Sequence, residues 1–150
     1  MAYHGIFKPK NPKKYKGDPT KIVFRSSWER DLCRKFDEHP NILEWSSEEV
    51  VIPYFYPADN KYHRYFVDFW VKLIDANGKI QEILYEVKPY KQTLPPKEPK
   101  KKTRKYVSEC LTYVKNQAKW QAASKYASQR GMTFQILTEN EIKPTIMRKK

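Results

Sequence analysis

The sequence lacks long apolar runs and has few cysteines and histidines. Its 150 residues include no apolar stretch long enough to cross a bilayer, and we expect no signal peptide because the N-terminus has no apolar core. Cys33 and Cys110, the two cysteines, are not spaced as a Cys-x-x-Cys pair, and the three histidines form no zinc pattern with them. These absences argue against a membrane-spanning protein and a zinc site, and they favour buried free thiols in a reducing compartment.

Acidic residues are also scarce relative to basic ones. The chain has 17 Asp and Glu against 30 Lys and Arg, which gives a formal net charge of +13. Such an excess favours a polyanionic partner, and without membrane signals nucleic acid is the better candidate. Basic ribosome-like proteins share this charge, so charge alone does not identify an activity. The length suits a single domain with one modest core.

The stretch from Tyr65 to Tyr90 places ionisable groups inside apolar strand-like runs. Two such runs flank a turn at Asp75-Ala-Asn-Gly78, and an Asn-Gly turn predicts a β-hairpin. Asp68 interrupts the first run, while Glu86 and Lys88 lie two residues apart in the second and therefore share one face of a strand. Buried charges need a partner, and oxygen ligands are what magnesium prefers. We therefore predict a metal site on this hairpin.

The remaining pattern predicts a mixed α+β domain. A helix is expected from Ser26 to His39, strands over residues 50–56, 62–74 and 79–88 as an antiparallel meander, a long helix over 106–129, and a last strand over 132–137. The order is helix, three-stranded meander, helix, strand. The long helix has an apolar stripe and a possible break near Asn116; the stripe consists of Val107, Leu111, Val114, Ala118, Ala122 and Tyr126.

Glu29 has two interpretations that do not exclude each other. Ser26 and Glu29 fit a capping box, in which the serine accepts from an amide three residues on and the glutamate reaches back. Alternatively, Glu29 is an acidic helix residue that reaches into the metal site.

Two basic segments flank this core. Residues 1–21 are expected to form an extended N-terminal arm, anchored by Tyr3, Phe7 and Tyr15, that contacts phosphates or docks on protein; a solvated tail is the alternative. Residues 89–105 combine prolines with a dense run of Lys and Arg, which predicts an exposed loop over the DNA path or a solvated linker. The domain proper would then span residues 22–150.

The acidic pattern resembles the PD-(D/E)XK nuclease superfamily, which implies a restriction-endonuclease-like core. An aspartate within an apolar strand (Asp68), a hairpin turn, and then Glu86-Val-Lys88 on the next strand carry the resemblance. Val67 stands where the motif's name has proline. The resemblance implies that Asp68, Glu86, the Val87 carbonyl and Glu29 bind Mg²⁺ or Mn²⁺, and that Lys88 orients the attacking water. The alternative for Lys88 is a simple ion pair with Glu86 or Asp68. The catalytic set is then Glu29, Asp68, Glu86 and Lys88.

Further motifs along the chain resemble the head completion nucleases of T-even-type tailed phages. They are Lys10-Asn-Pro12, Tyr15-Lys-Gly-Asp18, Arg25-Ser26, Trp28-Glu29, Ile52-Pro-Tyr-Phe55, Arg64-Tyr-Phe66, Glu86-Val-Lys-Pro89, Pro95-Pro96, Lys119-Trp120 and Ile136-Leu-Thr-Glu139. The resemblance implies a Mg²⁺-dependent DNA endonuclease that processes the packaged DNA end before tail attachment. It implies double-stranded DNA and head or neck (portal or connector) proteins as partners. The expected locations are the host cytoplasm during assembly and the virion.

Phosphate contacts are expected from basic side chains that position DNA without reading its sequence. The candidates are Arg25, Arg64, Lys100, Lys101, Lys102, Arg104 and Lys105, with Tyr65 beside them. The alternative function is a non-catalytic neck or head-plug protein that binds DNA ends on a nuclease-like fold. A transposition endonuclease of the same fold is disfavoured because the motifs reach both termini, and an RNA-binding module would leave the hairpin carboxylates unexplained.

Overall fold

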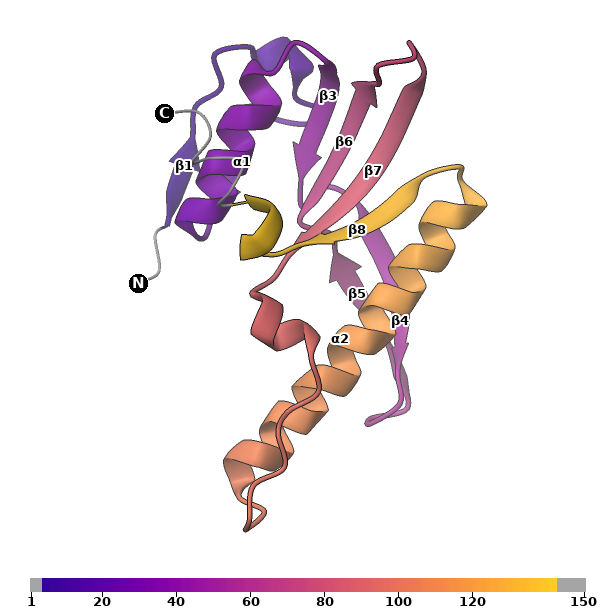
Figure 1. Cartoon of the computed structure of the whole chain (residues 1–150). Helices are drawn as coiled ribbons and strands as arrows, with labels where there is room; N and C mark the ends of the chain where they lie inside the picture. The colour runs from indigo at the N-terminus through magenta and orange to yellow at the C-terminus, as the bar shows by residue number, and fades with distance from the viewer. Residues whose placement is uncertain (1–3, 143–150) are drawn as a thin grey trace.

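The computed structural model describes residues 4–142, in which a four-stranded mixed sheet carries helices α1 and α2 (Figure 1). The strand order is β3-β6-β7-β8, with β8 parallel to β7 and the other neighbours antiparallel. Strands β1-β2 and β4-β5 form two-stranded sheets. The helices and strands are β1 Gly5–Phe7, β2 Ile22–Phe24, α1 Ser27–Glu38, β3 Ile42–Ser47, β4 Val51–Tyr56, β5 Lys61–Phe66, β6 Phe69–Ile74, β7 Ile80–Val87, α2 Arg104–Gln129 and β8 Thr133–Leu137, with 3-10 turns η1 Pro12–Lys14 and η2 Tyr90–Thr93.

Alternation along the strands divides the core into two clusters, because successive strand residues point to opposite faces. Phe69 and Val71 join the cluster that contains the buried face of α1, which includes Leu32, Cys33 and Phe36. Trp70 and Leu84 join the cluster that contains Trp120, Ala123 and Ala127 of α2. Met132, Phe134 and Ile136, from the predicted last strand, all pack against this second cluster.

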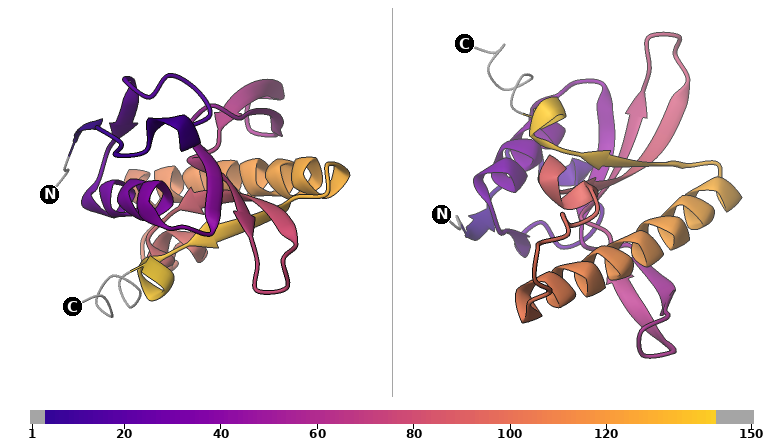
Figure 2. Two further views of the ribbon diagram at one scale, coloured as in Figure 1. Left: turned by 90° about the horizontal axis from the view of Figure 1, so that it is seen from above. Right: turned by 60° about the horizontal axis from the view of Figure 1, so that its bottom comes forward.

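The mixed α+β class and the Asp75–Gly78 turn are confirmed. Both antiparallel pairings of the predicted meander also occur, but its middle strand is not continuous. The expected strand over 62–74 is two strands, β5 and β6, which pair with different partners: β5 with β4, and β6 with β3 and β7. The change of partner occurs at Val67 and Asp68, where the Val67 amide donates to Val50 and the Asp68 carbonyl accepts from Glu48. Figures 1 and 2 show the β4-β5 and β6-β7 hairpins pointing away from each other, so Asp68 lies at their junction.

The N-terminal segment packs on the body of the protein. Strand β1 pairs with β2, and Tyr15 is buried against Trp45 with ring centroids 4.8 Å apart. The buried Asp37 carboxylate accepts from the amides of Lys10 at 2.8 Å and Asn11 at 3.0 Å. Phe7 and Tyr15 therefore anchor this segment as expected, while Tyr3 lies outside the described residues.

Helix α2 is continuous and longer than its packed part. The N-cap Thr103 accepts from the Tyr106 amide at 3.2 Å, and no break occurs at Asn116, which is buried. The predicted apolar stripe is wrong in its first half, because the side chains of Val107, Leu111 and Val114 are exposed. The first half of α2 runs beyond the sheet in Figure 1, so nothing in the described chain buries that stripe. No helix among residues 4–142 is long and apolar enough to cross a membrane.

Candidate active site

Strand register brings Asp68 and Glu86 together. Phe69 pairs with Tyr85 across β6 and β7, and continuing that antiparallel register by one residue places Asp68 opposite Glu86. The Asp68 carboxylate accepts from the amide of Val87 at 2.8 Å, which ties it to β7. Two residues that are 18 apart in sequence are therefore held side by side by strand pairing and by this side-chain bond.

Both carboxylate oxygens of Glu86 have partners, although its side chain is almost fully buried. Oε1 accepts from the hydroxyl of Tyr65 at 2.6 Å, and Oε2 lies 3.6 Å from Nζ of Lys88. Tyr65 was expected to contact phosphate from the surface; it is 3% exposed and points inward instead. Its burial, with Glu86 next to it, raises the pKa of Tyr65, so its hydroxyl keeps the proton that it donates.

Neighbouring carboxylates help to raise the pKa of two groups at this site, Asp68 and Glu29. Burial, and after it the charge of Glu86, raises the pKa of Asp68 well above its ordinary value, and Glu29 adds to the effect. Burial is also the main cause that raises the pKa of Glu29, followed among the raising effects by the charges of Glu48 and Glu86. Like charges in a buried place favour either a proton or a cation between them. The donor set is of hard oxygens, which suits a divalent cation.

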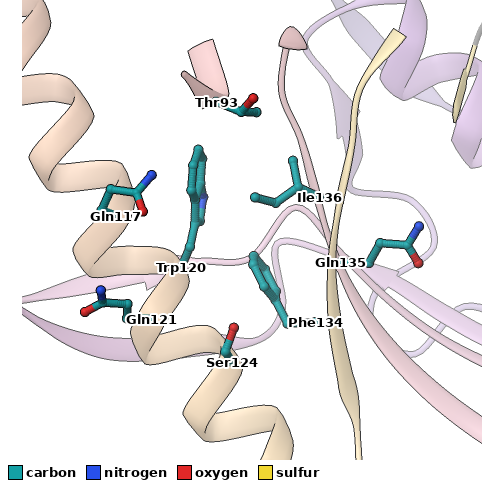
Figure 3. Close-up of a pocket in the computed structure, with 8 residues that line it drawn as sticks. All are labelled: Thr93, Gln117, Trp120, Gln121, Ser124, Phe134, Gln135 and Ile136. Atoms are coloured by element: carbon teal, nitrogen blue, oxygen red, sulfur yellow. The ribbon is translucent and has the colours of Figure 1, made fainter. Parts of the chain in front are cut away.

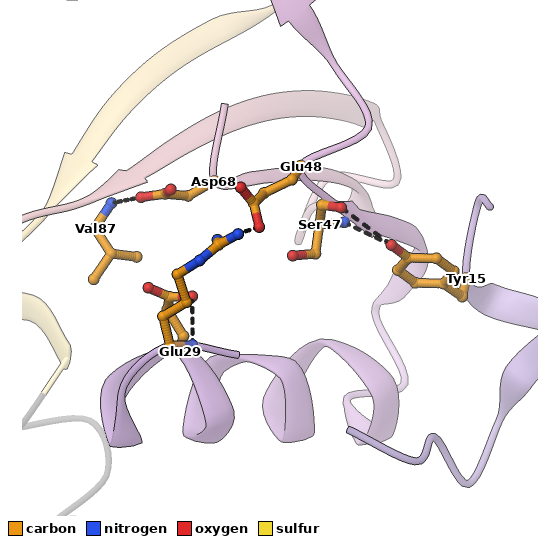
Figure 4. A network of polar contacts seen from close by, with 7 residues as sticks. Tyr15, Glu29, Ser47, Glu48, Asp68 and Val87 are labelled. Atoms are coloured by element: carbon orange, nitrogen blue, oxygen red, sulfur yellow. Dashed lines mark hydrogen bonds and ion pairs between the residues drawn. The ribbon is translucent and has the colours of Figure 1, made fainter. Parts of the chain in front are cut away.

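Glu29 combines the helix-cap geometry with a place near the other carboxylates. Its amide donates to Oγ of Ser26 at 3.1 Å, and its own Oε1 accepts from the amide of Arg25 at 3.2 Å, one residue before the N-cap. The cap prediction is confirmed in its serine half, while the glutamate reaches one residue further back than a capping box requires. Figure 4 shows the Glu29 side chain rising from the start of α1 toward the level of Asp68 and Glu48.

The three predicted carboxylates do not form a closed metal cage. Among residues 4–142, no group of three or more His, Cys, Asp and Glu side chains lies close enough together to hold a metal ion. Asp68 and Glu86 remain adjacent through their strands, and Glu29 approaches them from α1. The roles predicted for Glu29, Asp68, Glu86, Lys88 and the Val87 carbonyl therefore remain predictions.

The predicted DNA-contacting residues are spread over three places. Arg25 pairs with Glu48 and borders the carboxylates of the site. Its pKa is raised mainly by the bond to Glu48 and, to a smaller extent, by the nearby charges of Glu29 and Asp68. Arg64 is exposed on β5, with its guanidinium 5.6 Å from the ring centroid of Phe66. The other five, Lys100, Lys101, Lys102, Arg104 and Lys105, are exposed at the N-terminal end of α2, away from the sheet in Figures 1 and 2.

Lys119 of α2 also faces this site, a role that the sequence pattern did not predict. Its ammonium lies 5.4 Å from the ring centroid of Tyr65 and 6.0 Å from that of Tyr54. Burial is the main cause that lowers the pKa of Lys119; Glu86 and Asp68 raise it, while Lys88 and Lys115 lower it. The Lys119-Trp120 motif was the signal in the sequence that marked this position. Helical spacing alone could not reveal which strand residue it meets.

A separate cavity of about 680 Å³ lies between α2 and β8 (Figure 3). Trp120, Phe134 and Ile136 supply its apolar wall, and the rest of the lining is neutral and polar: Thr93, Gln117, Gln121, Ser124 and Gln135. None of the predicted catalytic residues lines it, and it contains no charged side chain. The cavity is therefore unsuited to a phosphate or a metal ion.

Comparison with known proteins agrees with the fold class. Residues 39–139 match the family described as TnsA-like endonuclease N terminal. This range includes Asp68, Glu86, Lys88 and Lys119, and it begins after Arg25 and Glu29. The Head completion nuclease of Enterobacteria phage T4 is 44% identical over 147 residues, which cover 95% of each chain. The restriction-endonuclease-like class and the resemblance to head completion nucleases are thereby confirmed. The chain belongs to the TnsA-like endonuclease N-terminal family.

Proposed function

We propose that this protein is a metal-dependent DNA endonuclease that acts in phage head completion and processes the packaged DNA end before the tail is attached. The observation that carries the proposal is the junction of Asp68, Glu86 and Lys88, where two carboxylates share a largely buried place with one lysine. The family's description as an endonuclease and the relative's name support it.

The carboxylates supply the metal-binding side of the chemistry. Asp68 and Glu86, with the Val87 carbonyl, would hold Mg²⁺ or Mn²⁺, and Glu29 would contribute from α1. When bound, the ion would activate a water and stabilise charge on the phosphate. The Tyr65 hydroxyl, 2.6 Å from Glu86, fixes the rotamer of that ligand and leaves its other oxygen turned toward Lys88.

Lys88 acts on the water and the phosphate. Its ammonium lies 3.6 Å from Glu86, so the strand holds a positive charge beside the carboxylates. From there it orients the attacking water and stabilises the negative charge that develops on the scissile phosphate. Arg25, Arg64 and the loop lysines would hold the DNA backbone outside the site, a sequence-independent role.

The proposal also covers the setting. Double-stranded DNA is the substrate, and head or neck proteins, portal or connector, are the protein partners. The protein would be present in the host cytoplasm during assembly and then in the virion.

A plasmid cleavage assay tests the activity. Cleavage should require Mg²⁺ or Mn²⁺, stop with a chelator, and be abolished by Asp68→Asn, Glu86→Gln and Lys88→Ala, while DNA binding persists. Glu109→Gln and Lys125→Ala, which change exposed charges on α2, are matched controls and should cut like the parent. Cutting that is unaffected by chelator refutes the metal mechanism. DNA binding with no cutting under any ion supports a non-catalytic neck or head-plug protein instead.

A further inference from the structure

The outer face of the β4-β5 hairpin is rich in exposed aromatic side chains. The inner residues Ile52, Tyr54, Tyr56 and Tyr65 are buried in the cluster that contains α2. Alternation places the other residues of both strands on the opposite face, in the cross-strand pairs Val51–Phe66, Pro53–Arg64 and Phe55–Tyr62. Phe55, Phe66 and Tyr62 are 40%, 43% and 75% exposed. We call Phe55, Tyr62, Arg64 and Phe66 the aromatic row.

These side chains contact one another and leave ring surface open. The rings of Phe55 and Tyr62 meet edge to face, with centroids 5.3 Å apart, and the Arg64 guanidinium lies over Phe66. A strand face that only meets water normally carries polar residues. Phe55, Tyr62 and Phe66 stay exposed among the described residues, so the aromatic content of this face points to a ligand.

The composition of the row favours nucleic acid with unpaired bases. Every base has a flat face that stacks on an aromatic ring, and an arginine between rings can meet the phosphates. The six outward positions of the hairpin include one charged residue, Arg64, and it is cationic; the chain as a whole carries +13. Paired bases already stack on each other within a duplex, so this surface suits a single strand better.

The row also leads to the candidate active site. Phe66 is two residues before Asp68, and Val51 is three residues after Glu48, which pairs with Arg25. Strand residues rise about 3.3 Å each, so Tyr62 and Phe66 lie about 13 Å apart along β5 with Arg64 between them. The Phe66 end of the row is therefore the end nearest to Asp68 along the chain, while the Tyr65 hydroxyl that contacts Glu86 lies on the other face of the hairpin.

We propose that the aromatic row binds single-stranded DNA next to the bond to be cut, so that the substrate is a DNA end or junction with unpaired nucleotides. This inference rests on the proposed function, because it takes DNA as the substrate and places the row beside the proposed cutting site. It makes Arg64 part of a stacking surface rather than an isolated phosphate contact.

Fluorescence of a single-stranded oligonucleotide containing 2-aminopurine tests the row, in chelator so that nothing is cut. Stacking should quench the signal, and Tyr62→Ala should weaken single-strand binding about 5-fold to 150-fold while duplex binding changes little. Phe55→Ala should act in the same direction. Leu111→Ala, which removes an exposed apolar side chain on α2, is the control. A thermal melt of each variant confirms folding, which the exposed Tyr62 ring should not affect.

The outcomes separate this inference from the proposed function. If Tyr62→Ala and Phe55→Ala leave both quenching and single-strand affinity unchanged, or weaken duplex binding equally, the inference is wrong and the row is better explained as a protein contact. That result leaves metal-dependent plasmid cutting standing. If the parent never cuts DNA but its single-strand binding depends on both rings, the row is supported and the nuclease proposal fails.

Discussion

Replacing Glu29 by glutamine and by alanine separates its two roles, because only alanine removes the helix-cap acceptor. The bond from the Arg25 amide to Glu29, at 3.2 Å, is worth about 0.5–1.5 kcal/mol net. A negative charge at a helix N-terminus adds about 0.3–1 kcal/mol. Burial and the charges of Glu48 and Glu86, which raise the pKa of Glu29, offset part of this.

Glu29→Ala should therefore lower the free energy of unfolding by about 1 kcal/mol, or Tm by about 2–4 °C for a chain of this size. Glu29→Gln retains an acceptor for the Arg25 amide and removes a charge that its neighbours disfavour. Its stability should stay within about 0.5 kcal/mol of the parent, which is typical of a mild substitution. If Glu29 also serves the metal site, cleavage should fall at least about tenfold in both variants, a change equivalent to about 1.4 kcal/mol.

Ser26→Ala is the matched control. It removes the hydroxyl that accepts from the Glu29 amide at 3.1 Å and should cost about 0.5–2 kcal/mol. It changes no charge near Asp68, so it should melt earlier yet cut like the parent at a temperature where both are folded.

Thermal melts and Mg²⁺-dependent cleavage rates, measured on the same preparations, decide the matter. If Glu29→Gln cuts like the parent while Glu29→Ala only melts earlier, Glu29 is a helix cap and does not belong to the site. If Ser26→Ala loses cleavage as strongly as Glu29→Gln, the loss comes from the helix start and the assignment of Glu29 as a ligand is refuted.

Three further predictions follow from the charges and contacts of the site and the loop. In chelator, Asp68→Asn should stabilise the protein near pH 7, because burial and Glu86 raise the pKa of Asp68 in the folded protein. The gain in stability should shrink as the pH falls toward 3.8. Urea titrations across that pH range measure the gain, and a gain that does not change with pH contradicts the prediction. Tyr65→Phe leaves the buried Glu86 with one hydrogen-bond donor fewer and should lower the free energy of unfolding by about 1–3 kcal/mol. It should also lose cleavage at temperatures where it is folded. A variant with an unchanged melting temperature and cleavage rate would show that the hydroxyl is dispensable. The third prediction replaces five loop residues with glutamine: Lys100, Lys101, Lys102, Arg104 and Lys105. The slope of log affinity against log salt concentration should become shallower by about 0.9 for each lost phosphate contact. An unchanged slope means that the loop does not touch DNA.

The features that sequence predicted well are set by neighbours in the chain. The Asn77-Gly78 turn closes the β6-β7 hairpin because Gly78 adopts a φ of 79°, which favours glycine. Ser26 caps α1 through an amide three residues away. The proximity of Asp68, Glu86 and Lys88 follows from that turn and from strand alternation. The pattern of charged residues within apolar runs was therefore sufficient to predict which residues the hairpin would bring together.

Partner choice along the strands was not predictable in the same way. Residues 62–74 read as one strand through Val67 and Asp68, yet β5 pairs with β4 and β6 pairs with β3 and β7. Alternation records which face a side chain takes, and it contains no information about which strand lies alongside. Helical periodicity likewise predicts an apolar stripe but not what would bury it. The first half of α2 has such a stripe, and the sheet ends before it could cover those residues.

The sequence alone determined the chain's basic charge, its helix caps, the hairpin and the acidic residues that the hairpin carries, because each depends on composition or on contacts a few residues apart. Tertiary structure decided that Tyr65 turns inward to Glu86, that Lys119 approaches the same site from α2, and that the outer face of β4-β5 stays open. These depend on contacts between residues 21 to more than 50 apart in the chain. Such contacts arise only when the two clusters of the core pack and assign each strand and helix its neighbours.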